Sequence, residues 1–258
     1  MTVRYGICAA NAGEFGDPRA LVALGEAAER AGWDAFFIND HVLYHHRDWP
    51  VANPTVVLGA LAARTSRIRL GTLMTALPRR RPQVVAREVA TLAALAGADR
   101  VIFGAGLGSM DAEYAAFGED PDLRARATRL DEGLAFLSGA WSGRPVDGGP
   151  MLPAARIPIW CAGRWPRRAG FRRAARWDGV VPTFAGYDQA NPPPPDLLRA
   201  VVDLVGPGKD VAMEGASRDG SVVAPYAAAG LTWWLEAFTW RRGPLAEAFT
   251  RVAAGPPV

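Results

Sequence analysis

Eight short apolar segments divide the chain almost from end to end, and each ends in a glycine, an asparagine, an aspartate or a turn. They occupy residues 3–9, 35–40, 68–75, 100–106, 157–163, 179–184, 210–215 and 231–238. Between them, apolar residues recur at helical spacing, as in Leu21, Leu24 and Ala28. This repeated alternation of strand and helix predicts an α/β fold, a single (β/α)8 TIM barrel over residues 1–258.

Length and composition agree with one such domain. A (β/α)8 barrel needs roughly 250 residues, and this chain has 258, of which 50% are hydrophobic. No apolar run reaches the ~18 residues of a membrane span, and the first fifteen residues lack the pattern of a signal peptide. We therefore expect a cytoplasmic protein without a membrane partner. Cys8 and Cys161 fall on strands one and five, so we expect two core thiols and no disulfide.

The formal net charge of +3 does not by itself identify a partner. Arginine carries almost all of the positive charge, in pairs and triplets spread over the chain. A nucleic-acid interface would need one basic stripe with interleaved aromatic residues. The expected partner is therefore a small-molecule substrate and not a nucleic acid.

The end of the second strand carries all three histidines of the chain, His41, His45 and His46, directly after Asp40. Active sites of (β/α)8 barrels lie at the C-terminal ends of the strands. An imidazole beside a carboxylate is suited to proton transfer or to hydrogen bonding a ring cofactor, so His41 and Asp40 are candidate catalytic residues. A metal site would use the same residue types, but no second ligand cluster follows on a later strand, and we expect no metal.

Two glycine-containing strand ends are candidate cofactor sites. Residues 103–109 resemble the G-x-G-x-x-G dinucleotide motif, but Ser109 stands in place of the third glycine, and Gly106 and Gly108 fit close backbone approach to a flat ligand or a neighbouring strand better. Strand five continues into Gly163, Arg164, Trp165 and Arg168, where a helix start with arginines predicts a phosphate site. The alternative is an ordinary loop whose arginines face water.

Strand eight places a carboxylate among aromatic residues. Alternation puts Trp233, Leu235 and Ala237 on one face and Trp234, Glu236 and Phe238 on the other. A glutamate facing the barrel lumen needs a partner or a role, so Glu236 is a third candidate catalytic residue that contacts His41, an arginine or the ligand. An ion pair that closes the barrel explains it equally well.

Taken together, several segments resemble the luciferase-like monooxygenase superfamily of flavin- and deazaflavin-dependent enzymes. The matching segments are AGWD at 31–34 leading to residues 40–41, IRLGTLMTALPRRRP at 68–82, FGAGLG at 103–108, residues 130–143, 158–163 and 173–179, and AGLTWWLE at 229–236. They cover most of the chain in the order of the family.

The resemblance implies a reduced flavin or a deazaflavin with its ring in the barrel mouth. It places Asp40, His41 and Thr75 near the ring, the strand-four glycines beside the tail, and residues 163–168 at the phosphate, and it makes Thr72 a further cofactor-binding residue. It also implies a non-proline cis peptide near Thr72 and Leu73, and a homodimer. Two departures stand out: Ser109 replaces a glutamate that some members carry, and residues 143–156 are shorter than usual, which would reduce the cover over the site.

Three functions follow from the resemblance. The first is a monooxygenase using reduced flavin mononucleotide (FMN) and oxygen on a small organic substrate. The second is a dehydrogenase or reductase that uses a deazaflavin of the F420 type, whose longer anionic tail would benefit from Arg79, Arg80 and Arg81 in addition to the arginines after strand five. The third is a non-catalytic flavin-binding barrel. The choice of cofactor decides between them.

Overall fold

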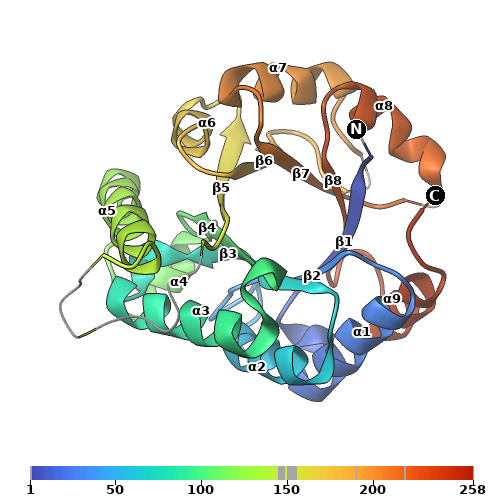
Figure 1. The fold of residues 1–258 in the computed structure, drawn as a ribbon, viewed down its shortest axis with the longest axis horizontal. Helices are drawn as coiled ribbons and strands as arrows, with labels where there is room; N and C mark the ends of the chain where they lie inside the picture. Colours follow the sequence, from blue (N-terminus) through green and yellow to red (C-terminus); the bar gives the residue numbers. More distant parts are fainter. Residues whose placement is uncertain (1, 145–148, 150–155, 190, 218, 258) are drawn as a thin grey trace.

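The computed structural model describes residues 2–144, 149, 156–189, 191–217 and 219–257. Across these residues, eight parallel strands close into a barrel in the order β1 to β8, and the helices surround it (Figure 1). The predicted (β/α)8 architecture is confirmed. Among the described helices, none is both long enough and apolar enough to cross a membrane.

The strands are β1 Arg4–Ala9, β2 Ala35–Ile38, β3 Arg69–Ala76, β4 Val101–Gly106, β5 Ile159–Trp165, β6 Gly179–Phe184, β7 Asp210–Gly215 and β8 Trp233–Phe238. The α-helices are α1 Pro18–Arg30, α2 Pro54–Arg64, α3 Pro82–Ala96, α4 Asp111–Ala115, α5 Leu123–Trp141, α6 Ala169–Ala174, α7 Pro195–Val205, α8 Ala224–Ala228 and α9 Leu245–Ala253.

Local sequence explains where several elements begin. The Asp17 side chain accepts a hydrogen bond from the Arg19 N–H at 2.9 Å, and a proline opens the helix behind it. Asn53 caps α2 in the same way through the N–H of Val56. Such caps satisfy backbone donors that have no partner within the helix.

Three strands differ from their predicted bounds at the C-terminal end, and β3 does so by one residue, since it ends at Ala76 and not at Thr75. β2 stops at Ile38 and not at Asp40, because the side chains of Asn39 and Asp40 bond to β3 and the segment after it. β5 extends to Trp165, where it still pairs with Phe184 of β6. The predicted bounds of β6 and β7 agree with the structure.

The buried apolar residues form two clusters, one between barrel and helices and one inside the barrel. Inside, Phe37, Trp160 and Trp233 meet from three separate strands, with ring centroids 5.4–6.5 Å apart. The guanidinium groups of Arg4 and Arg69, at the starts of β1 and β3, lie 5.2 and 5.9 Å from the ring centroid of Trp233. This aromatic plug therefore fills the N-terminal end of the lumen, and a ligand must use the C-terminal mouth.

Candidate active site

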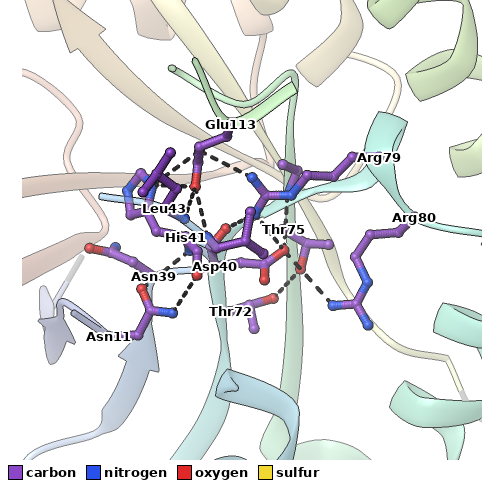
Figure 2. Close-up of polar contacts among 12 residues, drawn as sticks. Asn11, Asn39, Asp40, His41, Leu43, Thr72, Thr75, Arg79, Arg80 and Glu113 are labelled. Atoms are coloured by element: carbon purple, nitrogen blue, oxygen red, sulfur yellow. Dashed lines mark hydrogen bonds and ion pairs between the residues drawn. The ribbon is translucent and has the colours of Figure 1, made fainter. Parts of the chain in front are cut away.

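His41 is held by a buried glutamate from the loop after β4. Its Nδ1 lies 3.3 Å from both carboxylate oxygens of Glu113, a residue of α4 that is 1% exposed (Figure 2). The side chain of His41 keeps 16% exposure. With a carboxylate on Nδ1, that nitrogen carries the proton and Nε2 is the nitrogen able to accept one. The pair is thus arranged as a general base with an orienting partner.

Glu113 is the hub of the polar cluster in the mouth. Its Oε1 accepts the N–H groups of Val42 at 2.7 Å and of Leu43 at 3.2 Å, and its Oε2 lies 3.1 Å from Arg79 Nη1. Burial alone would raise the pKa of Glu113, but the hydrogen bond and charge of His41, the charge of Arg79 and the Val42 N–H outweigh it and lower that pKa. Glu113 is therefore ionised at neutral pH.

Asp40 lies in the same polar cluster, but its pKa is shifted in the opposite direction to that of Glu113. The N–H of Ala76 donates to its Oδ2 at 3.3 Å, and guanidinium nitrogens of Arg79 and Arg80 lie 3.6 and 3.8 Å from that oxygen. Burial raises the pKa of Asp40, and the two arginines and the Ala76 N–H oppose this rise without cancelling it. Figure 2 shows Arg79 and Arg80 reaching toward this carboxylate from the β3 side.

The arginines after β3 are therefore committed within the protein. Arg79 is 5% exposed and also donates to the Asp40 carbonyl, while Arg80 pairs with Glu88 at 2.6 Å. The expectation that residues 79–81 would together spread positive charge toward a cofactor tail is corrected for Arg79 and Arg80. Their charges are compensated by carboxylates, and Arg81 alone of the three is exposed.

Two asparagines fix the backbone around His41. The amide of Asn11 donates to the carbonyls of His41 and Ala52, both at 2.8 Å, and its oxygen accepts the His41 N–H at 3.2 Å. The amide of Asn39 donates to the Leu73 carbonyl at 2.6 Å. These bonds tie the ends of β1, β2 and β3 together beneath the imidazole.

Thr72 and Thr75 are placed differently from the expectation. They flank a register shift between β3 and β4, and their hydroxyls bond each other at 2.5 Å. Their register partners, Phe103 and Ala105, belong to the outer cluster, so the two hydroxyls face the helix layer and not the lumen. The non-proline cis peptide joins Leu73 to Met74, one bond after the predicted position and within the same strand end.

The glycines of β4 serve close packing. A Cβ on Gly106 would lie 3.3 Å from the Cβ of Ala162 and 3.4 Å from that of Met74. Gly108 has a φ of +76°, a conformation that favours glycine, and a Cβ there would meet the Tyr114 ring at 3.0 Å. The Tyr114 hydroxyl donates to the Leu107 carbonyl at 2.8 Å, which seats α4 and with it Glu113.

The predicted phosphate segment has a different local geometry. α6 begins at Ala169, six residues after Gly163, and has only six residues. A Cβ on Gly163 would lie 2.3 Å from the Phe171 ring, so helix packing explains this glycine. Arg164 and Arg168 are exposed, Trp165 is half-buried, and among the described residues no carboxylate pairs with either arginine. A phosphate site here stays a prediction, carried by the arginines.

Glu236 does not join His41. It is 0% exposed, its register partner Ile7 belongs to the outer cluster, and it accepts from Ser217 Oγ at 2.5 Å and from Trp234 Nε1 at 3.1 Å. Arg242 and Arg251 both pair with it. The lumen-facing interpretation is thus corrected, and Glu236 is part of an ion-pair network that fastens the segments after β7 and β8 to the barrel.

Sequence reasoning missed Glu113, Asn11 and Asn39. Glu113 follows a strand end, so the rule that barrel sites lie there could have found it. The shortened segment 143–156 lies mostly outside the described residues. His45 and His46 lie among Tyr44, Trp49 and Trp240.

Known proteins resemble this chain in sequence and in fold. F420-dependent glucose-6-phosphate dehydrogenase of Rhodococcus hoagii (strain 103S) is 37% identical over 194 residues, 69% of this chain and 57% of that protein. F420-dependent glucose-6-phosphate dehydrogenase 1 of Rhodococcus jostii (strain RHA1) is 36% identical over 181 residues, 64% of this chain and 53% of that protein. The chain thus spans about half the length of the curated relatives it matches.

Solved structures show the fold alone at their lower identities. An F420-dependent secondary alcohol dehydrogenase in complex with an F420-acetone adduct has a TM-score of 0.75 and 16% identity, covering 99% of this chain and 100% of its own. The FMN-bound oxygenating constituent of 3,6-diketocamphane monooxygenase from Pseudomonas putida has a TM-score of 0.67, also at 16% identity, covering 100% of this chain and 81% of its own. The sequence model of the luciferase-like monooxygenase family matches residues 4–191, and the chain belongs to this family.

Proposed function

We propose that this protein is a deazaflavin-dependent oxidoreductase that moves a hydride between coenzyme F420 and a small organic substrate carrying an alcohol or a carbonyl group. The observation that carries the proposal is the His41 and Glu113 pair, 3.3 Å apart at the barrel mouth. Removal of a hydride from an alcohol carbon requires that a base take the hydroxyl proton, and this pair is built as such a base.

The residues of the mouth fit a cofactor with a flat ring and an anionic tail. Apolar side chains, with Trp160 and Phe37 below them, close the lumen beneath the mouth, which suits a ring that stacks on an apolar floor. Exposed Arg164, Arg167 and Arg168, at and after the end of β5, offer guanidinium groups to phosphate and carboxylate. When bound, the deazaflavin supplies a two-electron acceptor or donor of hydride.

The residues of the chain account for the rest of the chemistry. His41 Nε2 accepts the hydroxyl proton of the substrate as hydride leaves the adjacent carbon. The Glu113 carboxylate holds Nδ1–H in place and stabilises the positive charge that His41 acquires. In the opposite direction, protonated His41 returns the proton to the carbonyl oxygen.

The relatives favour F420 over the cofactor ranked first from sequence. The two relatives described above are F420-dependent dehydrogenases, and their identity of 36 to 37% supports a shared cofactor class. Reduced FMN with oxygen is the competing function, supported by the family to which the chain belongs.

Paired titrations test the proposal. Purified protein is titrated with F420 and with FMN at low and moderate salt, and oxygen consumption is then measured with reduced FMN. We expect F420 to bind, with an affinity that falls as salt rises, because exposed charges are screened. Binding of FMN alone together with oxygen consumption would favour a monooxygenase, and binding without turnover of any alcohol or carbonyl substrate would favour a non-catalytic flavin-binding barrel.

A further inference from the structure

Glu214, near the end of β7, places a carboxyl group inside the barrel mouth. Its register partner is Leu235, a residue of the inner cluster, and Ala212, two residues earlier on the same face, also belongs to that cluster. Glu214 is therefore directed into the lumen, above the aromatic plug, where it stays half-buried.

The contacts of Glu214 connect it to the polar residues beneath His41. The thiol of Cys8 donates to its Oε1 at 3.4 Å, and the Asn39 amide lies 3.5 Å from the same sulfur. Gln189, in the segment after β6, also hydrogen-bonds the carboxyl group. Glu214 thus lies in the same mouth as His41 and takes part in a lumenal chain of polar contacts.

Glu214 differs from the buried carboxylates Glu113, Asp40 and Glu236 in its charge environment. Glu113, Asp40 and Glu236 each have an arginine within 4 Å. Among the described residues, no lysine or arginine forms an ion pair with Glu214. Burial raises the pKa of Glu214, while Cys8, Gln189 and the charge of His41 oppose the rise without cancelling it. The ionisable groups that face Glu214 are Cys8, His41 and Tyr44.

We propose that Glu214 is a catalytic proton donor: its carboxyl group, directed into the mouth, donates a hydrogen bond to the ligand there and gives up its proton where negative charge develops on that ligand. In this step the O–H bond of Glu214 breaks and the proton bonds to the ligand atom. The electron pair stays on the carboxylate, which takes a new proton from solvent. The role rests on the proposed function; the position of the carboxyl group in the mouth does not.

The mouth then holds a general acid and a general base on two different residues. His41, oriented by the ionised Glu113, takes protons, and Glu214 gives them. Groups whose environments push their protonation states apart are the usual basis of such a division. Glu214 would then provide, from β7, the carboxylic proton donor that Ser109 after β4 cannot.

Infrared spectroscopy of the ligand-free protein tests the neutral state. The difference between wild type and Glu214→Gln at pH 7 should contain the C=O stretch of a protonated carboxylic acid, and the exposed control Glu132→Gln should not. Cys8→Ala removes a hydrogen bond that lowers the pKa of Glu214, so in that variant the band should persist to higher pH. Absence of the band at pH 7 in the wild type would overturn the proposal.

Fluorescence titration with coenzyme F420 tests the contact. Wild-type affinity should fall as pH rises through the pKa of Glu214, and Glu214→Gln, which keeps an N–H donor, should show no such fall. Glu214→Ala should bind about two- to twelvefold more weakly, the scale of one neutral hydrogen bond. If wild type does not bind F420, the cofactor assignment fails and the same titration with FMN decides the role of Glu214. Identical pH profiles for wild type and Glu214→Gln with the cofactor that binds would sink it.

Discussion

At the scale of single residues, the mouth shows how the pKa values of neighbouring carboxyl groups come to shift in opposite directions. Glu113 receives a histidine, an arginine and two backbone N–H groups, and its pKa falls. Asp40 shares Arg79 with Glu113 at a longer distance and has Arg80 at 3.8 Å, and burial keeps its pKa raised. Hydrogen-bond number and distance, and not residue type, decide whether the pKa of each carboxyl group rises or falls.

His41→Ala should lower turnover by about a hundredfold or more, the scale of a general base, while the fold survives. Steady-state kinetics with the cofactor that binds, together with circular dichroism, would measure both effects. His46→Ala is the matched control and should keep wild-type turnover. Equal damage from both substitutions would point to a histidine cluster and not to a single base.

Glu113→Gln should destabilise the protein at pH 7 by ~3 to 5 kcal/mol, because Arg79 then loses a buried partner. The folded-state pKa of Glu113 lies below its ordinary value of 4.5, so its charge stabilises the fold above pH 4.5, and this contribution disappears as pH falls through the folded-state pKa. Denaturant unfolding across that range should therefore show the two proteins converging in acid. Parallel curves, or an equal loss in Glu132→Gln, would contradict the assignment.

At the scale of elements, the short helix α6 is fitted tightly onto β5. A Cβ on Gly163 would overlap the Phe171 ring, and one on Gly170 would come within 2.8 Å of the Ala162 carbonyl oxygen. Close contact between helix and strand leaves no space for side chains at these two positions. The arginines on either side of this contact are thus held at the rim of the mouth.

Gly163→Ala should cost ~1 to 3 kcal/mol, since the added methyl must displace Phe171. Gly59 offers a matched control: it lies within α2 and a Cβ there meets nothing within 4 Å. Gly59→Ala should be neutral or stabilising by ~0.5 to 1 kcal/mol, since alanine is the better helix former. Thermal unfolding of both variants would refute the packing explanation if they shift in the same direction.

The double variant Arg164→Ala with Arg168→Ala should weaken cofactor binding by ~1 to 4 kcal/mol through loss of charge-assisted hydrogen bonds. A second double variant, Arg30→Ala with Arg129→Ala, removes two exposed arginines from the outer helices and controls for net charge. Titration with F420 separates the two. Unchanged affinity in the first variant would move the phosphate site elsewhere.

At the scale of the whole molecule, α2 and α3 carry three exposed apolar side chains on the barrel exterior. Val56 of α2 and Leu95 of α3 are 70% and 59% exposed, and Val84 lies on the same pair of helices. These two helices are neighbours on the barrel exterior (Figure 1). Apolar surface of this kind is common at subunit interfaces, and we propose that α2 and α3 form the homodimer contact expected from the family resemblance.

Analytical ultracentrifugation would test this contact. The wild type should sediment as a dimer, and Val56→Arg with Leu95→Arg should sediment as a folded monomer, because buried unpaired charge is costly. Phe117, also 63% exposed but in the segment after α4, provides a control: Phe117→Arg should leave the mass unchanged. A wild-type monomer would rule the interface out.

The features of this structure that could be predicted are those that depend on residues close together in the sequence. Strand and helix periodicity is local, so the barrel and the bounds of β6 and β7 were predictable, as was His41 at a strand end. The partners of His41 were not, because Glu113 lies 72 residues away in the chain and meets it only when the barrel closes. The predicted direction of the Glu236 side chain was wrong for a related reason. Alternation along a strand defines two faces but does not tell which of them faces the barrel lumen.

The aromatic plug of Phe37, Trp160 and Trp233 has a kinetic consequence. With the lumen filled at one end, cofactor and substrate pass through the same opening, so the molecule that lies deeper must enter first and leave last. The reaction should then follow a compulsory order of addition and release, which product-inhibition patterns reveal. Any product that lingers near the rim would delay exchange of the molecule beneath it, and turnover would be limited by departure and not by the chemical step.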